Sequence, residues 1–113
     1  MLIGWTTVAS RPQADSLARG LIEARLAACA QIDGPIASIY RWEGKVEETA
    51  EYRLTLKFLA AQHRPLEAWL HRHHPYESPE WVVVAAEYVA EKYLSWAQAN
   101  ANSFPFSESV DPL

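Results

Sequence analysis

The sequence predicts an α+β fold, a ferredoxin-like βαββαβ sandwich with an added C-terminal helix. Three observations carry this prediction: a β-branched apolar segment at the N-terminus, a long stretch of period-two alternation in the middle, and two helix-periodic segments between strands. Half of the 113 residues are hydrophobic and five are Trp, so the chain can form a core. We expect one domain over residues 1–100 and a mobile polar tail over residues 101–113.

The first predicted strand covers residues 2–8, and a helix follows it. The strand segment, LIGWTTV, is apolar and β-branched. Ser10 with Gln13 three residues later is a capping-box pattern, and apolar residues then recur at helical spacing to about Ala27. Gly20 costs this helix about 1 kcal/mol relative to Ala. We therefore expect Gly20 to mark a close approach between the helix and the sheet.

The middle of the chain predicts a long β-hairpin. After a break at residues 33–35, Asp-Gly-Pro, residues 36–42 alternate between two faces. Residues 43 and 44, Glu-Gly, supply a turn, and residues 52–58 show the clearest period of two in the sequence. Two strands of this length extend beyond a small sheet and leave backbone groups unpaired. We therefore expect the chain to associate with copies of itself.

Three further elements complete the predicted order. Residues 62–73 have apolar spacing typical of a helix, with Pro65 acceptable in its first turn. Residues 81–86, WVVVAA, form a continuous apolar run that predicts the fourth strand. A last helix is expected over about residues 91–100, before the tail.

Charge and composition exclude several classes of function. The net charge of -4, without a Lys/Arg cluster longer than two residues, predicts neither a nucleic-acid nor a membrane partner. The only cysteine, Cys29, cannot form an internal disulfide, and the N-terminus lacks the pattern of a signal peptide. We therefore expect a cytoplasmic protein. No GxSxG elbow, P-loop or GxGxxG motif is present, so no catalytic residue is assigned and an enzyme is not expected.

The segment HHPYESPEW, residues 73–81, concentrates groups that bind metals or carry protons. A structural alternative is that His73 and His74 only complement the C-terminus of a helix. On a regular helix the two rings would point about 100° apart, but Pro75 disfavours helical geometry at His74, so the rings could converge. A pair made of His71 and His74 is the second choice.

Other reactive side chains have simpler interpretations. Cys29 lies in an apolar run, where a free cysteine usually behaves as a small buried hydrophobe. Tyr40 and Trp42 are expected to pack at a subunit contact rather than to bind a ligand. A solvated charged edge near the hairpin turn is the interpretation for Glu47, Glu48 and Glu51.

The chain resembles the CutA family, the divalent-ion tolerance proteins, in the order and spacing of four segments. These are RLAACAQI, SIYRWEGKVEE, HHPYESPE and YLSW, and the similarity extends over about residues 2–100. The most specific parts are YRWEGKVEE and HPYE followed by PE. The resemblance implies a ferredoxin-like homotrimer whose subunits are sealed by long β-hairpins.

The resemblance also implies a function without catalysis. Bacterial members are linked to copper tolerance and bind divalent copper through a Cys at the end of the first strand and paired His before Pro-Tyr. His73 and His74 match this pair, which implies a copper site there, but Thr6 stands at the Cys position and a hydroxyl is a weaker ligand. The alternative is a trimeric sensor resembling PII proteins, which would bind a small ligand in a cleft between subunits near His74, Tyr76 and Glu77.

Overall fold

The computed structural model describes residues 1–101, and its elements follow the predicted order. The predicted mobile tail begins at Ala101. Its remaining residues, 102–113, lie outside the described part. The elements are β1 (Leu2–Val8), α1 (Arg11–Glu23), β2 (Cys29–Trp42), β3 (Lys45–Phe58), the short 3-10 helix η1 (Ala60–Gln62), α2 (His63–His73), β4 (Val82–Ala85) and α3 (Glu91–Ala99).

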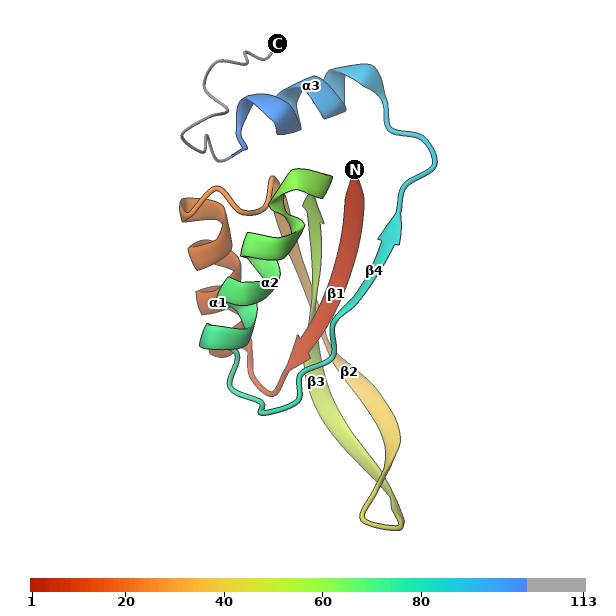
Figure 1. Cartoon of the computed structure of the whole chain (residues 1–113). Coiled ribbons are helices and arrows are strands. Elements are labelled where there is room, and N and C mark those ends of the chain that lie inside the picture. Colours follow the sequence, from red (N-terminus) through yellow and green to blue (C-terminus); the bar gives the residue numbers. More distant parts are fainter. Residues whose placement is uncertain (102–113) are drawn as a thin grey trace.

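The four strands form one antiparallel sheet in the order β2-β3-β1-β4. This order results from two split βαβ units, so the predicted α+β sandwich is confirmed at the level of the chain. Helices α1 and α2 lie side by side on one face of the sheet, and α3 lies at the end of the molecule opposite the hairpin tip (Figure 1). The two sheet edges, β2 and β4, have no further strand beside them among the described residues.

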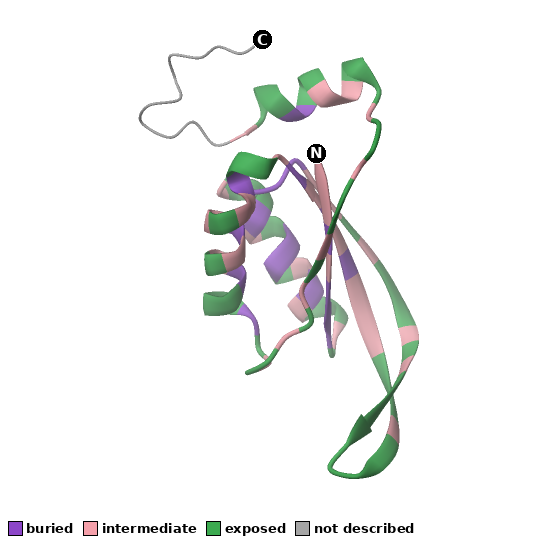
Figure 2. Ribbon diagram, turned by 45° about the vertical axis from the view of Figure 1, so that its right-hand side comes forward, coloured by how far each residue is buried: buried purple, intermediate pink, exposed green. Residues whose placement is uncertain are grey.

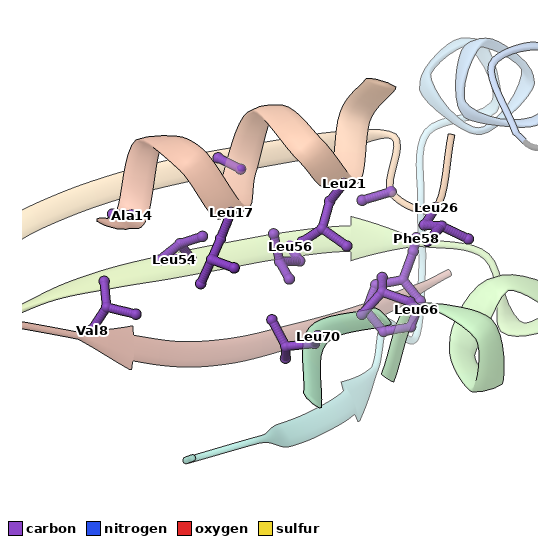
Figure 3. Close-up of a cluster of buried hydrophobic side chains, with 12 residues drawn as sticks. Val8, Ala14, Leu17, Leu21, Leu26, Leu54, Leu56, Phe58, Leu66 and Leu70 are labelled. Carbon is purple, nitrogen blue, oxygen red and sulfur yellow. The ribbon is translucent and has the colours of Figure 1, made fainter. Parts of the chain in front are cut away.

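The core lies between the two helices and the sheet face that they cover (Figure 3). Period-two alternation in β3 directs Leu54, Leu56 and Phe58 into this layer, and all three side chains are fully buried. Burial of one such side chain contributes roughly 1.5–3 kcal/mol. The core consists of Val8, Ala14, Leu17, Ala18, Leu21, Leu26, Ala27, Leu54, Leu56, Phe58, Leu66 and Leu70.

Helix α1 begins as predicted and ends four residues earlier than predicted. The Ser10 hydroxyl accepts a hydrogen bond from the Gln13 amide at 3.3 Å, so half of the expected capping box forms. At the other end, Arg25 has a φ of 59°, and the amides of Leu26 and Arg25 donate to the carbonyls of Leu21 and Ile22. This pairing closes the helix as a Schellman motif. The sequence did not indicate this helix end, because Arg instead of Gly occupies the position with left-handed backbone geometry.

Gly20 marks a close approach, but the expected neighbour was wrong. A Cβ atom at Gly20 would lie 2.6 Å from the ring of Trp69 on α2, which is closer than real side chains come. Glycine is therefore needed where α1 packs against the second helix, not where α1 packs against the sheet. Because Trp69 precedes the histidine segment by one helical turn, this contact also fixes the end of α2 that carries the candidate site.

The hairpin of β2 and β3 is longer than predicted. The expected break at residues 33–35 is wrong as a strand boundary, because β2 continues through it with a shift of register between Asp33 and Ile36. The turn has positive φ at Glu43 (50°) and Gly44 (79°), as two-residue hairpin turns require. The outer half of the hairpin is largely exposed and extends from the body of the molecule (Figure 2).

Candidate functional site

His74 is the first residue after α2, and its ring is buried. Its backbone is extended (φ -72°, ψ 136°), which confirms the predicted influence of Pro75. This geometry turns the ring away from the helix and toward the end of β1. There, His74 Nε2 lies 2.9 Å from the hydroxyl oxygen of Thr6 and 3.1 Å from the carbonyl oxygen of Thr7. Only 8% of His74 is exposed.

The hydrogen bonds of His74 determine its tautomer. The amide of Tyr76 donates to Nδ1 at 3.0 Å, so Nδ1 carries no proton. The proton of the neutral ring is therefore on Nε2, which donates it to the Thr7 carbonyl. Burial lowers the pKa of His74 below its usual range, and the bond to Thr7 only partly opposes this effect. His74 is a neutral side chain with both ring nitrogens bonded inside the chain.

His73 has a different environment, although it is the adjacent residue. Its side chain is exposed, and its ring stacks on Trp69 with centroids 3.9 Å apart. Nδ1 donates to the Trp69 carbonyl at 2.8 Å, so the lone pair of the neutral ring is on Nε2. His73 Nε2 has no hydrogen-bond partner in the part of the chain that the structure describes. Within that part, the two histidine rings share no hydrogen-bond partner.

Tyr76 connects the segment after α2 to the hairpin. Its hydroxyl donates to the Glu51 carboxylate on β3 at 2.8 Å, and its ring lies 5.1 Å from that of His74. Burial, followed by the bond to Glu51 and its charge, raises the pKa of Tyr76 to about 12. Glu77, the other residue expected to bind a ligand, is exposed. The fold thus links β1, β3 and the end of α2 through one polar cluster, Thr6, Thr7, Glu51, His74 and Tyr76.

Two residues in this polar cluster were not predicted from the sequence. Glu51 was assigned to a solvated charged edge, but it is half-buried and holds the Tyr76 hydroxyl, so that assignment is corrected. Period-two alternation does not indicate this contact, because it places Glu51 on the face of β3 opposite the buried Leu54 and Leu56. Thr7 takes part through its backbone carbonyl, for which the sequence contains no signal. Cys29 is half-buried rather than fully buried as expected.

The residues present fit a copper ion only in part. His73 Nε2 offers a free lone pair next to solvent, and a ring whose other nitrogen donates to a carbonyl is typical of metal-binding histidines. His74 would first have to exchange its bonds to β1, and Thr6 supplies a hydroxyl where a thiolate would bind more strongly. Among residues 1–101 no group of three or more His, Cys, Asp and Glu is arranged to hold a metal ion.

Comparison with known proteins identifies the family. The model of the CutA1 divalent ion tolerance proteins matches residues 2–100. The chain belongs to this family. The divalent-cation tolerance protein CutA of Escherichia coli O139:H28 is 35% identical over 94 residues, which cover 83% of this chain and 84% of that relative.

Solved CutA1 structures share the fold described above. The Thermus thermophilus protein superposes with a TM-score of 0.85 at 35% identity, over 90% of this chain and 100% of that one. CutA1 from Oryza sativa superposes with a TM-score of 0.87 at 31% identity, over 89% of this chain and 93% of that one. A bacterial and a plant protein thus share this fold with the chain.

Proposed function

We propose that this chain is a non-enzymatic CutA protein that forms a homotrimer and binds divalent copper at the end of α2, through His73 and His74. The observation that carries the copper proposal is the free Nε2 atom of His73. The Trp69 carbonyl holds the proton of the ring on Nδ1, so Nε2 presents its lone pair at the surface without a tautomer change. Imidazole suits copper, and Cu²⁺ is the most strongly bound of the first-row divalent ions.

His74 serves as a second ligand in this proposal, at an energetic cost. Its Nε2 atom must give up the Thr7 carbonyl and move its proton before it can bind an ion. Thr6, beside the same nitrogen, adds no thiolate. We therefore expect copper binding to be weak and little selective for Cu⁺, because soft ligands are absent.

The trimer proposal is supported by the surfaces that the single chain leaves uncovered. Near the hairpin turn, Ile39 and Val46 are each 68% exposed and Trp42 is 61% exposed. The outer sheet face carries Val82 and Val84, which are also exposed, and both sheet edges are unpaired within the described residues. Large apolar side chains in contiguous exposed positions are typical of interfaces between subunits.

Light scattering tests the trimer. The expected mass is three times that of the 12.8 kDa chain. Trp42→Glu, which places a charge among the apolar side chains of the hairpin, should lower the mass, whereas the matched change Glu43→Gln in the turn should not. A monomeric wild-type chain at micromolar concentration would contradict the proposal.

Calorimetric titration with Cu²⁺ tests the ligand. Ligating imidazoles must be neutral, so affinity should decrease as the pH falls through about 6.5. The absence of binding at about pH 7.5, where free imidazole is neutral, would contradict the copper proposal.

A second candidate function is a PII-like sensor that binds a small ligand between subunits. The Tyr76–Glu51 hydrogen bond favours it, because it places polar groups where the hairpin leaves the body of the molecule. Glu77 lies exposed one residue further along. Titration with a panel of metabolites beside copper separates the two functions, because a sensor should bind a metabolite in the His73→Ala variant as well.

A cytoplasmic location also remains a prediction. No helix within residues 1–101 is long and apolar enough to span a membrane.

A further inference from the structure

We propose that α2 carries a second site for a divalent transition-metal ion, formed by His63 and Glu67, with His71 orienting the Glu67 carboxylate. The three side chains occupy positions i, i+4 and i+8, so they lie along one face of the helix. His63 Nε2 lies 3.4 Å from Glu67 Oε1, and His71 Nε2 donates a hydrogen bond to Glu67 Oε2 at 3.3 Å. Their side chains are 33%, 43% and 48% exposed in chain order, so an ion can reach them from solvent.

The hydrogen bond from Trp81 makes the first pair unusual. The indole Nε1–H of Trp81 donates to His63 Nε2 at 3.3 Å, so Nε2 is an acceptor and the ring proton is on Nδ1. The same Nε2 atom faces a carboxylate oxygen of Glu67, which is also an acceptor. Two acceptors that face each other without a proton between them repel. A cation placed between them removes the repulsion.

The spacing of these atoms fits a metal ion. Two ligands that each lie about 2.1 Å from a tetrahedral Zn²⁺ ion are about 3.4 Å apart, and His63 Nε2 and Glu67 Oε1 have this separation. Imidazole with carboxylate is a donor set for zinc, copper and nickel. The three groups do not converge on one point, in keeping with the absence of any three-ligand set in residues 1–101. The ion is therefore held by His63 Nε2 and Glu67 Oε1, water completes its coordination, and the hydrogen bond from His71 orients the Glu67 carboxylate.

The ring of His63 is held in place before any ion binds. It packs against Phe58 (centroids 5.6 Å apart) and Trp81 (6.1 Å), and those two rings stack on each other. A fixed ligand loses little conformational freedom on binding. This site is distinct from His73 and His74, because within residues 1–101 no hydrogen bond or ion pair joins either of those residues to Glu67.

Zinc titration of the full chain tests the proposal, with the ion alone as the probe. Glu67→Gln keeps the shape of the side chain and removes its charge, and it should weaken Zn²⁺ binding about tenfold or more, since even outer partners of a metal contribute that much. His73→Ala is the matched control and should leave this binding step unchanged. The failure of this site would leave copper binding at His73 unaffected, so the two proposals fail separately.

The indole N–H signal of Trp81 in an NMR spectrum provides a second measurement. Zn²⁺ on His63 Nε2 takes the acceptor from the indole, so this signal should shift during the titration in the wild type and stay in place in Glu67→Gln. Equal zinc affinity in both proteins would overturn the proposal. So would an unshifted Trp81 signal at saturating zinc, or the loss of all zinc binding in His73→Ala.

Discussion

The last turn of α2 and the segment that follows it each carry a histidine, and the two histidines have different environments. His73 belongs to the helix and is exposed, and within residues 1–101 only one of its ring nitrogens has a hydrogen-bond partner, the Trp69 carbonyl to which it donates. His74 has left the helix, is buried, and uses both ring nitrogens in bonds to Thr7 and Tyr76. Two adjacent residues therefore differ in role. His73 has a ring nitrogen available to an ion, and His74 holds neighbouring segments together through hydrogen bonds.

The cause of this difference is local. Pro75 forces extended geometry on His74, which directs the ring to β1 instead of along the helix. His73 keeps helical geometry and reaches back to a carbonyl four residues earlier, as side chains at a helix end commonly do. Two adjacent histidines thus do not offer an ion equivalent ligands, because His74 must first give up its bond to Thr7. The comparison predicts different effects of the same substitution at the two positions.

The largest expected effect is the loss of stability in His74→Ala. The change leaves the Tyr76 amide and the Thr7 carbonyl without partners and empties a buried volume, at a cost of about 2–4 kcal/mol. His73→Ala removes an exposed ring and should cost less than about 1 kcal/mol. Urea unfolding of both variants measures the difference. Equal losses would remove the structural distinction between the two histidines.

The pH dependence of stability sharpens the same comparison. The pKa of His74 is lowered in the folded state, so below pH 6.5 the unfolded chain binds the proton more readily than the folded one. The contribution of His74 is therefore fully present above the unfolded pKa and decreases as the pH falls below it, until the folded ring also protonates. Unfolding curves across this range should show the decrease in His73→Ala but a smaller one in His74→Ala. A decrease of the same size in both variants would assign it to other groups.

A smaller effect is expected at Tyr76, one step further from the helix. Tyr76→Phe removes the hydrogen bond to Glu51, which is half-buried, and should cost about 1 kcal/mol. Tyr88→Phe is the matched control, because Tyr88 is 82% exposed and its change should have no measurable effect. Titration of phenol absorbance should also lose the group with a pKa of about 12 in Tyr76→Phe. An unchanged titration would contradict the buried environment of this hydroxyl.

Most of the fold could be predicted because it depends on periodicity. Period two in β3 indicated the buried face of Leu54, Leu56 and Phe58, and helical spacing indicated α1 and α2. The errors occurred where one residue acts against its usual preference. Arg25 ends a helix in a left-handed conformation, and β2 accommodates the Asp33 region as an irregularity instead of stopping there.

The candidate site could be predicted only as a set of residue types. The sequence indicated His73, His74 and Tyr76, and Pro75 correctly predicted that His74 leaves helical geometry. It could not give the partners of these residues, because Thr7 and Glu51 are 67 and 25 positions away from His74 and Tyr76, respectively. Such contacts are set by the pairing of strands and by the position of α2 on the sheet. They decide which imidazole is free, and therefore how the segment can bind an ion.

Copper titration of the two histidine variants tests the proposed function most directly. It is best done in the Glu67→Gln background at about pH 7.5, so that the other proposed site does not contribute and free imidazole is neutral. The proposal predicts that His73→Ala weakens Cu²⁺ binding about tenfold or more, and that His74→Ala, once its lower stability is allowed for, weakens it less. If His73→Ala binds copper as tightly as the background protein, the free Nε2 atom of His73 is not the ligand and the copper proposal is wrong.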